Sequence, residues 1–310
     1  MRTLFCFLLI LFTSIISTAQ NKLEGEISIS GAFALYPMTV KWADEFRKIH
    51  PDVRIDISAG GAGKGIADAL SDMVDIGMVS REIYPEELGK GAFSISVTKD
   101  AVIPIISTSN PLLNSILIIG LKKDIAHAIW ITGTCKTWNQ AFGIKTALPI
   151  HIYSRSDACG AAEMWAKYLG KKQEDLLGVG VFGDPGLAQA VKRDALGIGF
   201  NNIGYIYDAN TKKPIKGISV IPIDLNGNGQ IDKDEKFYDT IDELINAIVT
   251  NKYPSPPARE LYFVTKGKPQ KKEVLEFIRW VLTNGQKFVH EAGYIDLPKN
   301  KLNREMKKIN

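Results

Sequence analysis

The first hundred residues alternate between strand-like and helix-like patterns of apolar positions. Short apolar or alternating runs predict strands over 26–30, 53–57 and 74–79. Apolar residues on one face predict a helix that ends near His50-Pro51, and a second helix opens over 66–70. Strands that alternate with helices imply a parallel sheet, whose ligands bind at the carboxyl edge of the strands.

The same alternation returns in the second half of the chain. We expect strands over 102–106, 149–153, 179–182, 196–200, 218–223 and 261–264. Helical patterns lie around 165–169, 171–177, 185–191, 237–249, 274–282 and 286–292, and a lysine-rich tail follows over 296–310. A chain of 310 residues usually exceeds a single core, so two α/β domains are expected.

The amino terminus has the pattern of a secretory signal peptide. An apolar run over 4–12 is too short to span a bilayer, and small residues follow it up to Ala19. We expect cleavage after Ala19, which makes 1–19 the signal peptide and the periplasm the destination. Cys6 lies inside the apolar run, which argues against a lipoprotein anchor. Only Cys135 and Cys159 then remain, so no disulfide framework is expected, and whether these two pair stays open.

Composition and charge exclude one class of partner. The chain is 45% hydrophobic and 23% charged, which is ordinary for a globular protein, and its formal net charge is +4. No dense basic run interleaves with aromatic residues, so the sequence has no nucleic-acid footprint.

The stretch from His151 to Leu169 is the strongest candidate for an anion site. A predicted strand, a turn of small residues over 155–160 and a helix start would group free backbone N–H groups at the positive end of a helix dipole. Asp157 is placed to cap the helix, and Arg155 adds a cation suited to a carboxylate or a tetrahedral oxyanion. The alternative is an ordinary strand-to-helix connection with a surface arginine.

A glycine-rich loop over 58–65 precedes the second predicted helix. It fails the Walker A pattern, because Ser58 and Gly65 stand where that pattern needs glycine and a hydroxyl residue. It also fails the dinucleotide pattern, because Ile66 stands where a third small residue belongs. A flexible loop that leads to a helix start remains, with Lys64 beside it; a plain tight turn is the alternative.

The segment 224–235 has the spacing of an EF-hand calcium loop. Such loops place oxygen ligands at positions 1, 3, 5, 7, 9 and 12, with glycine at position 6. Gly229 falls at position 6, and Ile231 is the apolar residue that follows. The predicted ligands are Asp224, Asn226, Asn228, Gln230 (through its carbonyl), Asp232 and Glu235. A strand precedes the loop, so we expect a structural calcium site of EF type without paired helices; a polar turn is the alternative.

Eight segments, in this order and spacing, resemble the phosphate-binding proteins of ABC uptake systems. They are 31–44, 60–65, 74–81, 129–138, 155–160, 197–199, 259–262 and 285–294. The resemblance implies the α/β fold of a type II periplasmic binding protein, with two lobes of mostly parallel sheet flanked by helices and a hinged cleft between them. Lobe I would be 20–100 and 259–310, and lobe II would be 101–258. A monomer that delivers phosphate or a similar oxyanion to an ABC permease is implied.

The resemblance also implies where the anion binds, and this chain departs from the family there. The implied ligand-binding residues are Ala34, Leu35, Ala62, Lys64, Ser80, Arg81, Arg155, Cys159, Gly160 and Ala161. The family usually has serine or threonine hydroxyls where this chain has Ala34, Ala62, Cys159 and Ala161, and an acceptor aspartate where it has Ser80. Each charged hydrogen bond contributes about 1.5–3 kcal/mol, so binding weakens unless Lys64, Arg81 or the Cys159 thiol compensates. The identity of the oxyanion therefore stays open.

Two other functions compete with uptake. A protein of the same fold without a permease would act as an oxyanion sensor or interaction module, and the sequence does not separate the two. An enzyme would use Cys159 as nucleophile, because a helix N-terminus and Arg155 both lower a thiol pKa and His151 is near in sequence. We expect no catalytic residues, because a structural cysteine in a turn of small residues is commoner.

Overall fold

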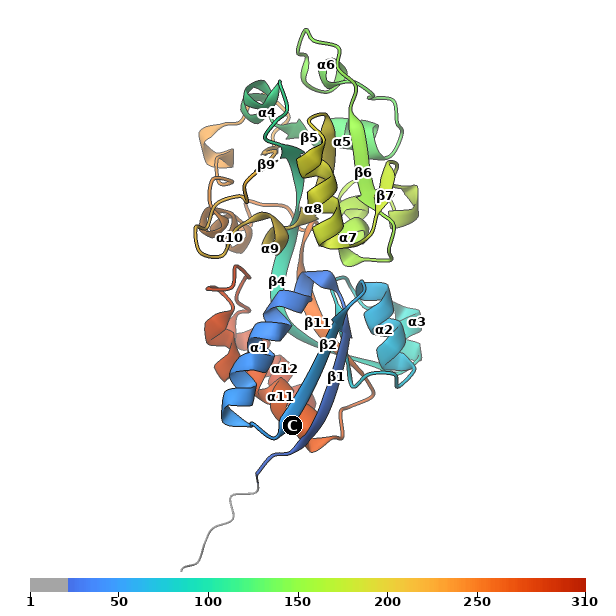
Figure 1. The fold of residues 1–310 in the computed structure, drawn as a ribbon, viewed down its shortest axis with the longest axis vertical. Coiled ribbons are helices and arrows are strands. Elements are labelled where there is room, and N and C mark those ends of the chain that lie inside the picture. The colour runs from blue at the N-terminus through green and yellow to red at the C-terminus, as the bar shows by residue number, and fades with distance from the viewer. Residues whose placement is uncertain (1–21) are drawn as a thin grey trace, which may run out of the picture.

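One curled sheet runs through the whole molecule and is shared by two lobes (Figure 1). The computed structural model describes residues 22–310, so the predicted signal peptide lies outside the described residues. The strand order is β2-β1-β3-β11-β4-β8-β6-β7, with β9 also paired to β4. The strands are β1 (Gly25–Gly31), β2 (Val53–Ala59), β3 (Ile76–Val79), β4 (Ala92–Ser107), β6 (His151–Arg155), β7 (Val179–Val181), β8 (Gly197–Asn202), β9 (Ile218–Val220) and β11 (Ala258–Lys266). A separate short pair joins β5 (Leu121–Lys122) and β10 (Ile223–Asp224).

Helices cover the sheet in both lobes. Lobe I contains α1 (Tyr36–Ile49), α2 (Ala62–Leu70), α3 (Pro85–Gly89), α11 (Lys272–Leu282) and α12 (Lys299–Ile309). Lobe II contains α4 (Leu113–Ile119), α5 (Lys123–Trp130), α6 (Trp138–Phe142), α7 (Gly160–Tyr168), α8 (Gly183–Arg193), α9 (Ile203–Ile206) and α10 (Ile241–Val249). No helix in the described part of the chain is long and apolar enough to span a bilayer.

The outer strands of each lobe are parallel, and the shared centre is antiparallel. In lobe I, β1 pairs with β2 and β3 in parallel; in lobe II, β6 pairs with β7 and β8 in parallel. The centre is β4, which pairs antiparallel with β11 over its first part and with β8 over its second. Because β4 crosses from one lobe to the other in a single strand, it forms the hinge together with β11 (Figure 1). The expected two-lobed α/β fold is confirmed, with a mixed sheet at its centre.

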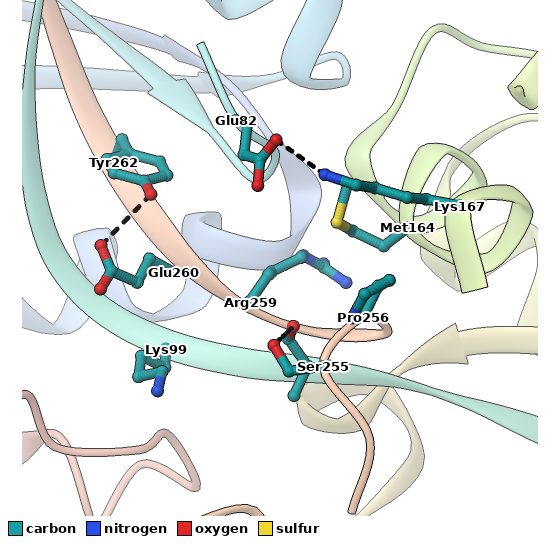
Figure 2. A pocket seen from close by; sticks show the side chains of 10 residues that line it. Glu82, Lys99, Met164, Lys167, Ser255, Pro256, Arg259, Glu260 and Tyr262 are labelled. Atoms are coloured by element: carbon teal, nitrogen blue, oxygen red, sulfur yellow. Dashed lines mark hydrogen bonds and ion pairs between the residues drawn. The ribbon is translucent and has the colours of Figure 1, made fainter. Parts of the chain in front are cut away.

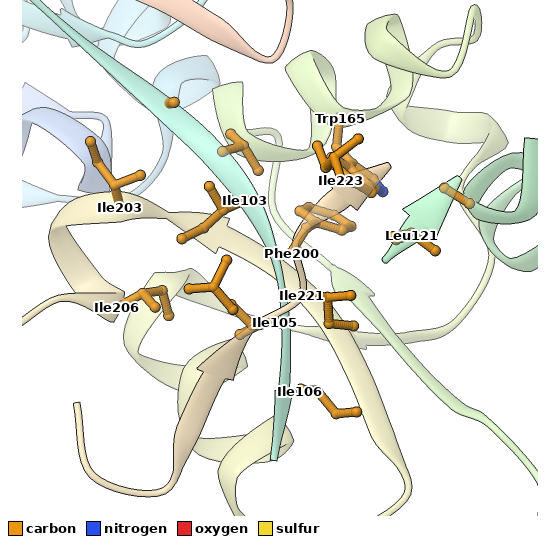
Figure 3. Packing of buried hydrophobic residues seen from close by; sticks show 14 of the residues in the cluster. Ile103, Ile105, Ile106, Leu121, Trp165, Phe200, Ile203, Ile206, Ile221 and Ile223 are labelled. Atoms are coloured by element: carbon orange, nitrogen blue, oxygen red, sulfur yellow. The ribbon is translucent and has the colours of Figure 1, made fainter. Parts of the chain in front are cut away.

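Each lobe has its own hydrophobic core. In lobe I, aromatic residues such as Trp42, Phe46 and Phe277 lie buried among residues 23–97 and 261–309. In lobe II, apolar residues between 101 and 258, joined by Ile295, surround Trp165 and Phe200, as Figure 3 shows. The Trp165 and Phe200 rings stack at 5.8 Å between centroids. Burying apolar surface stabilises each lobe separately, so neither core depends on the contacts between the lobes.

Several predicted element boundaries were wrong. The second helix, α2, begins at Ala62 and so includes part of the predicted glycine-rich loop. The pattern over 237–249 is helical only in α10, and the pattern over 171–177 contains only a 3-10 turn, Gln173–Asp175. The lysine-rich tail forms α12, whose Ile309 is buried. Local propensity alone does not set these boundaries, since tertiary packing overrides it.

Candidate anion-binding site

The strand, turn and helix predicted around Arg155 are present, but the cap of the helix differs from the prediction. Arg155 is the last residue of β6, and α7 begins at Gly160. Cys159, not Asp157, is the N-cap residue, and its Sγ accepts a hydrogen bond from the backbone N–H of Ala162 at 3.5 Å. Asp157 is therefore free to bond elsewhere, and it bonds to Arg155.

Arg155 donates to two carboxylates inside lobe II. Its Nε and Nη2 donate to the two oxygens of Asp157 at 2.8 and 2.7 Å, and its Nη1 donates to Asp184 Oδ2 at 2.7 Å. The Arg155 side chain is 1% exposed. Burial opposes the charged guanidinium, yet the nearby Asp184 carboxylate leaves the pKa of Arg155 raised. Arg155 is thus held in one orientation as a permanent cation.

Four of the predicted residues present backbone N–H groups without a partner. Within residues 22–310, no acceptor lies in hydrogen-bonding range of the backbone N–H of Ala34, Ala62, Gly160 or Ala161. All four residues are buried, at the first turns of the 3-10 helix Phe33–Leu35, of α2 and of α7. Buried N–H groups are nearly always bonded, so these four are candidate donors to an anion, and we call them the anion-binding nest below.

Contacts between the lobes bring the parts of the nest together. The backbone N–H of Gly63 in α2 donates to the carbonyl oxygen of Ala158 in lobe II at 3.0 Å. The ring centroid of Phe33 lies 5.6 Å from the guanidinium carbon of Arg155. A Cβ atom added at Gly160 would lie 2.1 Å from the carbonyl oxygen of Ser80, so only glycine fits there. The segments of both lobes that carry these donors therefore meet beside Arg155.

The other predicted ligand residues contribute less. The backbone N–H of Leu35 already donates to the Ala32 carbonyl at 3.1 Å. Lys64 forms an ion pair with Asp68, and Arg81 donates to both oxygens of Glu87 at 2.9 and 2.7 Å. The expectation that Lys64 or Arg81 replaces the missing hydroxyls is not supported, because each cation pairs with a carboxylate of its own lobe.

Cys159 has none of the surroundings of a nucleophile. Burial raises the pKa of its thiol to about 12, outweighing the nearby Arg155 charge that lowers it. His151 is exposed and its Nδ1 lies 2.7 Å from Asp194, so it does not serve Cys159 as a base. Cys159 and Cys135 are both free thiols. These observations argue against the alternative of a Cys159-dependent enzyme.

Sequence reasoning missed a buried polar chain that leads from Arg155 to the hinge. Asp184 accepts from Arg155 and from the side-chain amide of Asn202, and Asn202 accepts from Arg259. Arg259 Nη2 lies 3.1 Å from Asp100 on the neighbouring strand β4. Burial raises the pKa of Asp100 to about 7, although the charge of Arg259 lowers it. The side chains of this hydrogen-bonded network are distant from one another in sequence, so no local motif predicts the network.

A pocket of about 330 Å³ lies on the hinge side of the lobe interface (Figure 2). Arg259 reaches across it from β11 towards Met164 of α7 (Figure 2). Its Nε and Nη1 are buried and have no hydrogen-bond partner among the described residues. At the rim, Lys167 donates to Glu82 of the other lobe at 2.7 Å. None of the predicted ligand-binding residues lines this pocket, so it is separate from the nest.

The predicted calcium loop closes on itself through hydrogen bonds. Both oxygens of Asp224 accept backbone N–H groups of the loop, from Gly227 at 2.7 Å and Gly229 at 2.8 Å. Glu235 likewise accepts from the backbone of Leu225 at 2.7 Å. The Gly229 backbone has a φ of 87°, which glycine tolerates and position 6 of such a loop needs.

The middle of that loop brings three of the predicted ligand side chains together. The amides of Asn226 and Asn228 each donate to Asp232 Oδ2 at 2.8 Å, and these donors hold the pKa of Asp232 below its usual value. The Gln230 amide also donates to Asp232. No three His, Cys, Asp or Glu side chains of residues 22–310 are grouped to hold a metal. A cation here would therefore depend on amide and carbonyl oxygens as well as carboxylates.

Comparison with known proteins places the chain in a family. A model described as the PBP superfamily domain matches residues 17–284, and the chain belongs to this superfamily. Protein SphX of Synechococcus elongatus is 25% identical over 290 residues, which cover 91% of this chain and 80% of that protein. The phosphate-binding protein PstS of Xylella fastidiosa is 25% identical over 324 residues, covering 91% and 84%. The predicted resemblance is thus confirmed.

Solved structures show the same fold. A Clostridium perfringens protein whose crystal structure contains bound phosphate superposes with a TM-score of 0.71 at 22% identity, covering 88% of this chain and 100% of that one. An ABC-type phosphate transport receptor from Vibrio cholerae superposes with a TM-score of 0.63 at 19% identity, with the same coverage of 88% and 100%. At these identities the likeness supports the fold alone.

Proposed function

We propose that the chain captures an oxyanion, with inorganic phosphate the first candidate, between its two lobes and delivers it to an ABC permease. The observation that carries the proposal is the anion-binding nest: four buried, unpartnered N–H groups from helix starts of both lobes, beside Arg155. Such groups bind an anion without any side-chain hydroxyl. The names of the relatives support phosphate, and the similar Vibrio cholerae protein is an ABC-type phosphate transport receptor. Export to the periplasm through 1–19 and a monomeric state belong to the same proposal.

The test is a ligand screen on refolded protein, since refolding removes anion carried through purification. Phosphate, sulfate, molybdate, tungstate and phosphonates are compared by thermal shift and calorimetry. A ligand at 100 times its Kd adds about 2.7 kcal/mol to the free energy of unfolding. Arg155→Ala is expected to weaken binding at least about tenfold, because it removes the buried cation beside the nest and leaves Asp157 and Asp184 without their partner.

Equal affinity in the Arg155→Ala protein would place the anion elsewhere. If no oxyanion in the screen raises the melting temperature, the proposal fails. A sensor of the same fold would bind the same anion, so the permease is tested separately, by reconstitution of phosphate uptake with an ABC phosphate permease.

We also propose that the loop 224–235 binds calcium weakly, as a structural ion. The convergence of Asn226, Asn228 and Asp232 supports this site, as does the matching spacing of Asp224 and Glu235. With two asparagine ligands, the expected Kd is near the weak extracellular range of about 10⁻⁴–10⁻³ M.

Calcium is expected to raise the melting temperature and EDTA to lower it, because the ion would fix the segment before α10. Glu235→Gln should abolish both effects by removing the bidentate ligand, whereas Asp234→Asn, at an exposed non-ligand position of the same loop, should preserve them. Calorimetry that detects no calcium uptake at millimolar concentration would exclude the site.

A further inference from the structure

One side chain of lobe II bonds directly to a peptide group of lobe I that carries a nest donor. Tyr205 lies in α9, and its hydroxyl donates to the carbonyl oxygen of Phe33 at 2.9 Å. This carbonyl belongs to the same peptide group as the backbone N–H of Ala34, one of the four nest donors. The Phe33–Ala34 peptide is planar and trans, so its C=O and its N–H point in opposite directions. A bond that fixes the direction of the carbonyl therefore also fixes the direction of the Ala34 N–H.

The sequence leaves the Phe33 carbonyl short of a donor from its own helix. In an α-helix this carbonyl would accept from the N–H four residues further on, but that residue is Pro37, which has no N–H. The N–H of Tyr36 is shared, since it donates to the carbonyls of both Ala32 and Phe33. The hydroxyl of Tyr205, from the other lobe, completes the bonding of the Phe33 carbonyl.

The nest donor of lobe II shows the ordinary arrangement for comparison. The backbone N–H of Gly160 shares its peptide group with the carbonyl of Cys159, which accepts from the N–H of Glu163 at 3.1 Å. The first turn of α7 therefore orients this donor without help from lobe I. The Ala34 peptide differs, because the bond that supplements its helix comes from the opposite lobe.

The Tyr205 hydroxyl is a permanent donor. Burial raises the pKa of Tyr205, and the Asp184 carboxylate raises it further, so the hydroxyl keeps its proton at neutral pH. A hydrogen bond accepted by a carbonyl polarises the whole peptide group, and the N–H of that group becomes a stronger donor. Tyr205 thus affects both the direction of the Ala34 N–H and its strength as a donor to an anion.

We propose that Tyr205 is a positioning residue for anion capture, whose hydroxyl orients and polarises the Phe33–Ala34 peptide when the lobes are closed. Tyr205 acts through this peptide and does not itself contact the anion. The inference rests on the proposed function, because it concerns one of the nest donors. It gives lobe II a part in ordering a donor of lobe I, so closure and anion affinity are linked at a single peptide group.

The first test is calorimetry with inorganic phosphate on refolded protein. Tyr205→Phe keeps the ring and removes only the hydroxyl, so the phosphate Kd should rise about fivefold, the equivalent of one neutral hydrogen bond. Tyr207→Phe is the matched control. It removes a hydroxyl two residues further on, which donates to the Tyr238 carbonyl inside lobe II at 2.8 Å, and it should leave the phosphate Kd unchanged.

Amide NMR distinguishes orientation of the peptide from a general loosening of lobe closure. At saturating phosphate, the amide nitrogen and proton resonances of Ala34 should move upfield in Tyr205→Phe relative to the wild type, because the peptide loses a bond at its carbonyl and its N–H donates less strongly. The resonances of Gly160 and Ala161, whose peptides do not bond to Tyr205, should keep their wild-type positions.

The outcomes separate this inference from the proposed function. An unchanged phosphate Kd in Tyr205→Phe would overturn the inference and leave oxyanion capture standing. A raised Kd with Ala34 resonances that move no more than those of Gly160 and Ala161 would also overturn it, since the hydroxyl would then act on lobe closure alone. Wild-type protein that does not bind phosphate would overturn the proposed function for this anion, and the inference with it.

Discussion

Two buried arginines, Arg155 and Arg259, lie between the lobes. They differ in which hydrogen-bond donors near them lack a partner. All three nitrogens of Arg155 donate to carboxylates, and the unbonded groups nearby are backbone N–H groups. At Arg259 the side chain itself is incompletely bonded, since Nε and Nη1 have no partner among the described residues. Main-chain donors do not depend on side-chain identity. Alanine at positions 34, 62 and 161 therefore removes side-chain hydroxyls but keeps the main-chain donors.

The contrast predicts that the nest depends on close backbone approach. Gly160→Ala would place a Cβ atom 2.1 Å from the Ser80 carbonyl oxygen of the other lobe. Overpacking of this kind costs about 1–3 kcal/mol, so oxyanion Kd should rise about fivefold to 150-fold. The variant should still fold, because open lobes relieve the clash. Gly89→Ala, where no atom lies within 4 Å of the added Cβ, is the control and should bind the oxyanion normally. Unchanged affinity in both variants would mean that anion binding does not need the close contact between Gly160 and Ser80.

The hinge should respond to pH, unlike the nest. Burial raises the pKa of Asp100 in the folded protein to about 7, well above the ordinary value for an aspartate, so the folded state binds a proton more tightly than the unfolded state. Stability contributed by protonated Asp100 is complete below about pH 4 and is lost as pH rises to about 7. At about 1.4 kcal/mol per pKa unit, the loss is on the order of 4 kcal/mol.

Denaturant unfolding of the wild type and of Asp100→Asn at several pH values measures this effect. The difference in unfolding free energy between the two proteins should shift in favour of Asp100→Asn as pH rises from about 4 to about 7. Asp56→Asn, at a surface position, should track the wild type. A pH-independent difference would mean that Asp100 does not titrate in this range.

The smallest effect is expected at the rim of the hinge pocket. Glu82 and Lys167 bond across the lobes at 2.7 Å, but their side chains are 71% and 42% exposed. Exposed ion pairs contribute little and are screened by salt. Lys167→Ala should therefore weaken oxyanion binding less than about twofold, and the effect should vanish at about 1 M salt; a tenfold loss would assign this pair a role in closure that its exposure does not suggest.

The sequence predicted local features of the site well and its long-range contacts poorly. Arg155, the turn after it and the start of α7 are contiguous, so the strand and helix patterns around them located them. Asp184 lies 29 residues from Arg155, and Asp100 lies 159 residues from Arg259. Only the fold brings such partners together, and the hydrophobic periodicity of the sequence does not predict these contacts.

The carboxyl-terminal segment contains a helical pattern of apolar residues that was not recognised from the sequence. Four lysines lie in 296–310, yet Leu302, Met306 and Ile309 recur at helical spacing, and α12 packs that face against lobe I. Only the lysines were noted from the sequence, whereas the three apolar positions account for the helix.

The central claim is that backbone N–H groups, more than side chains, hold the anion, and amide NMR tests it most directly. Addition of phosphate to deuterated, refolded protein should shift the amide protons of Ala34, Ala62, Gly160 and Ala161 downfield as each gains an acceptor. The Leu35 amide, already bonded to the Ala32 carbonyl, is the internal control and should move little. Saturable phosphate binding that leaves those four amide protons unshifted would contradict the account.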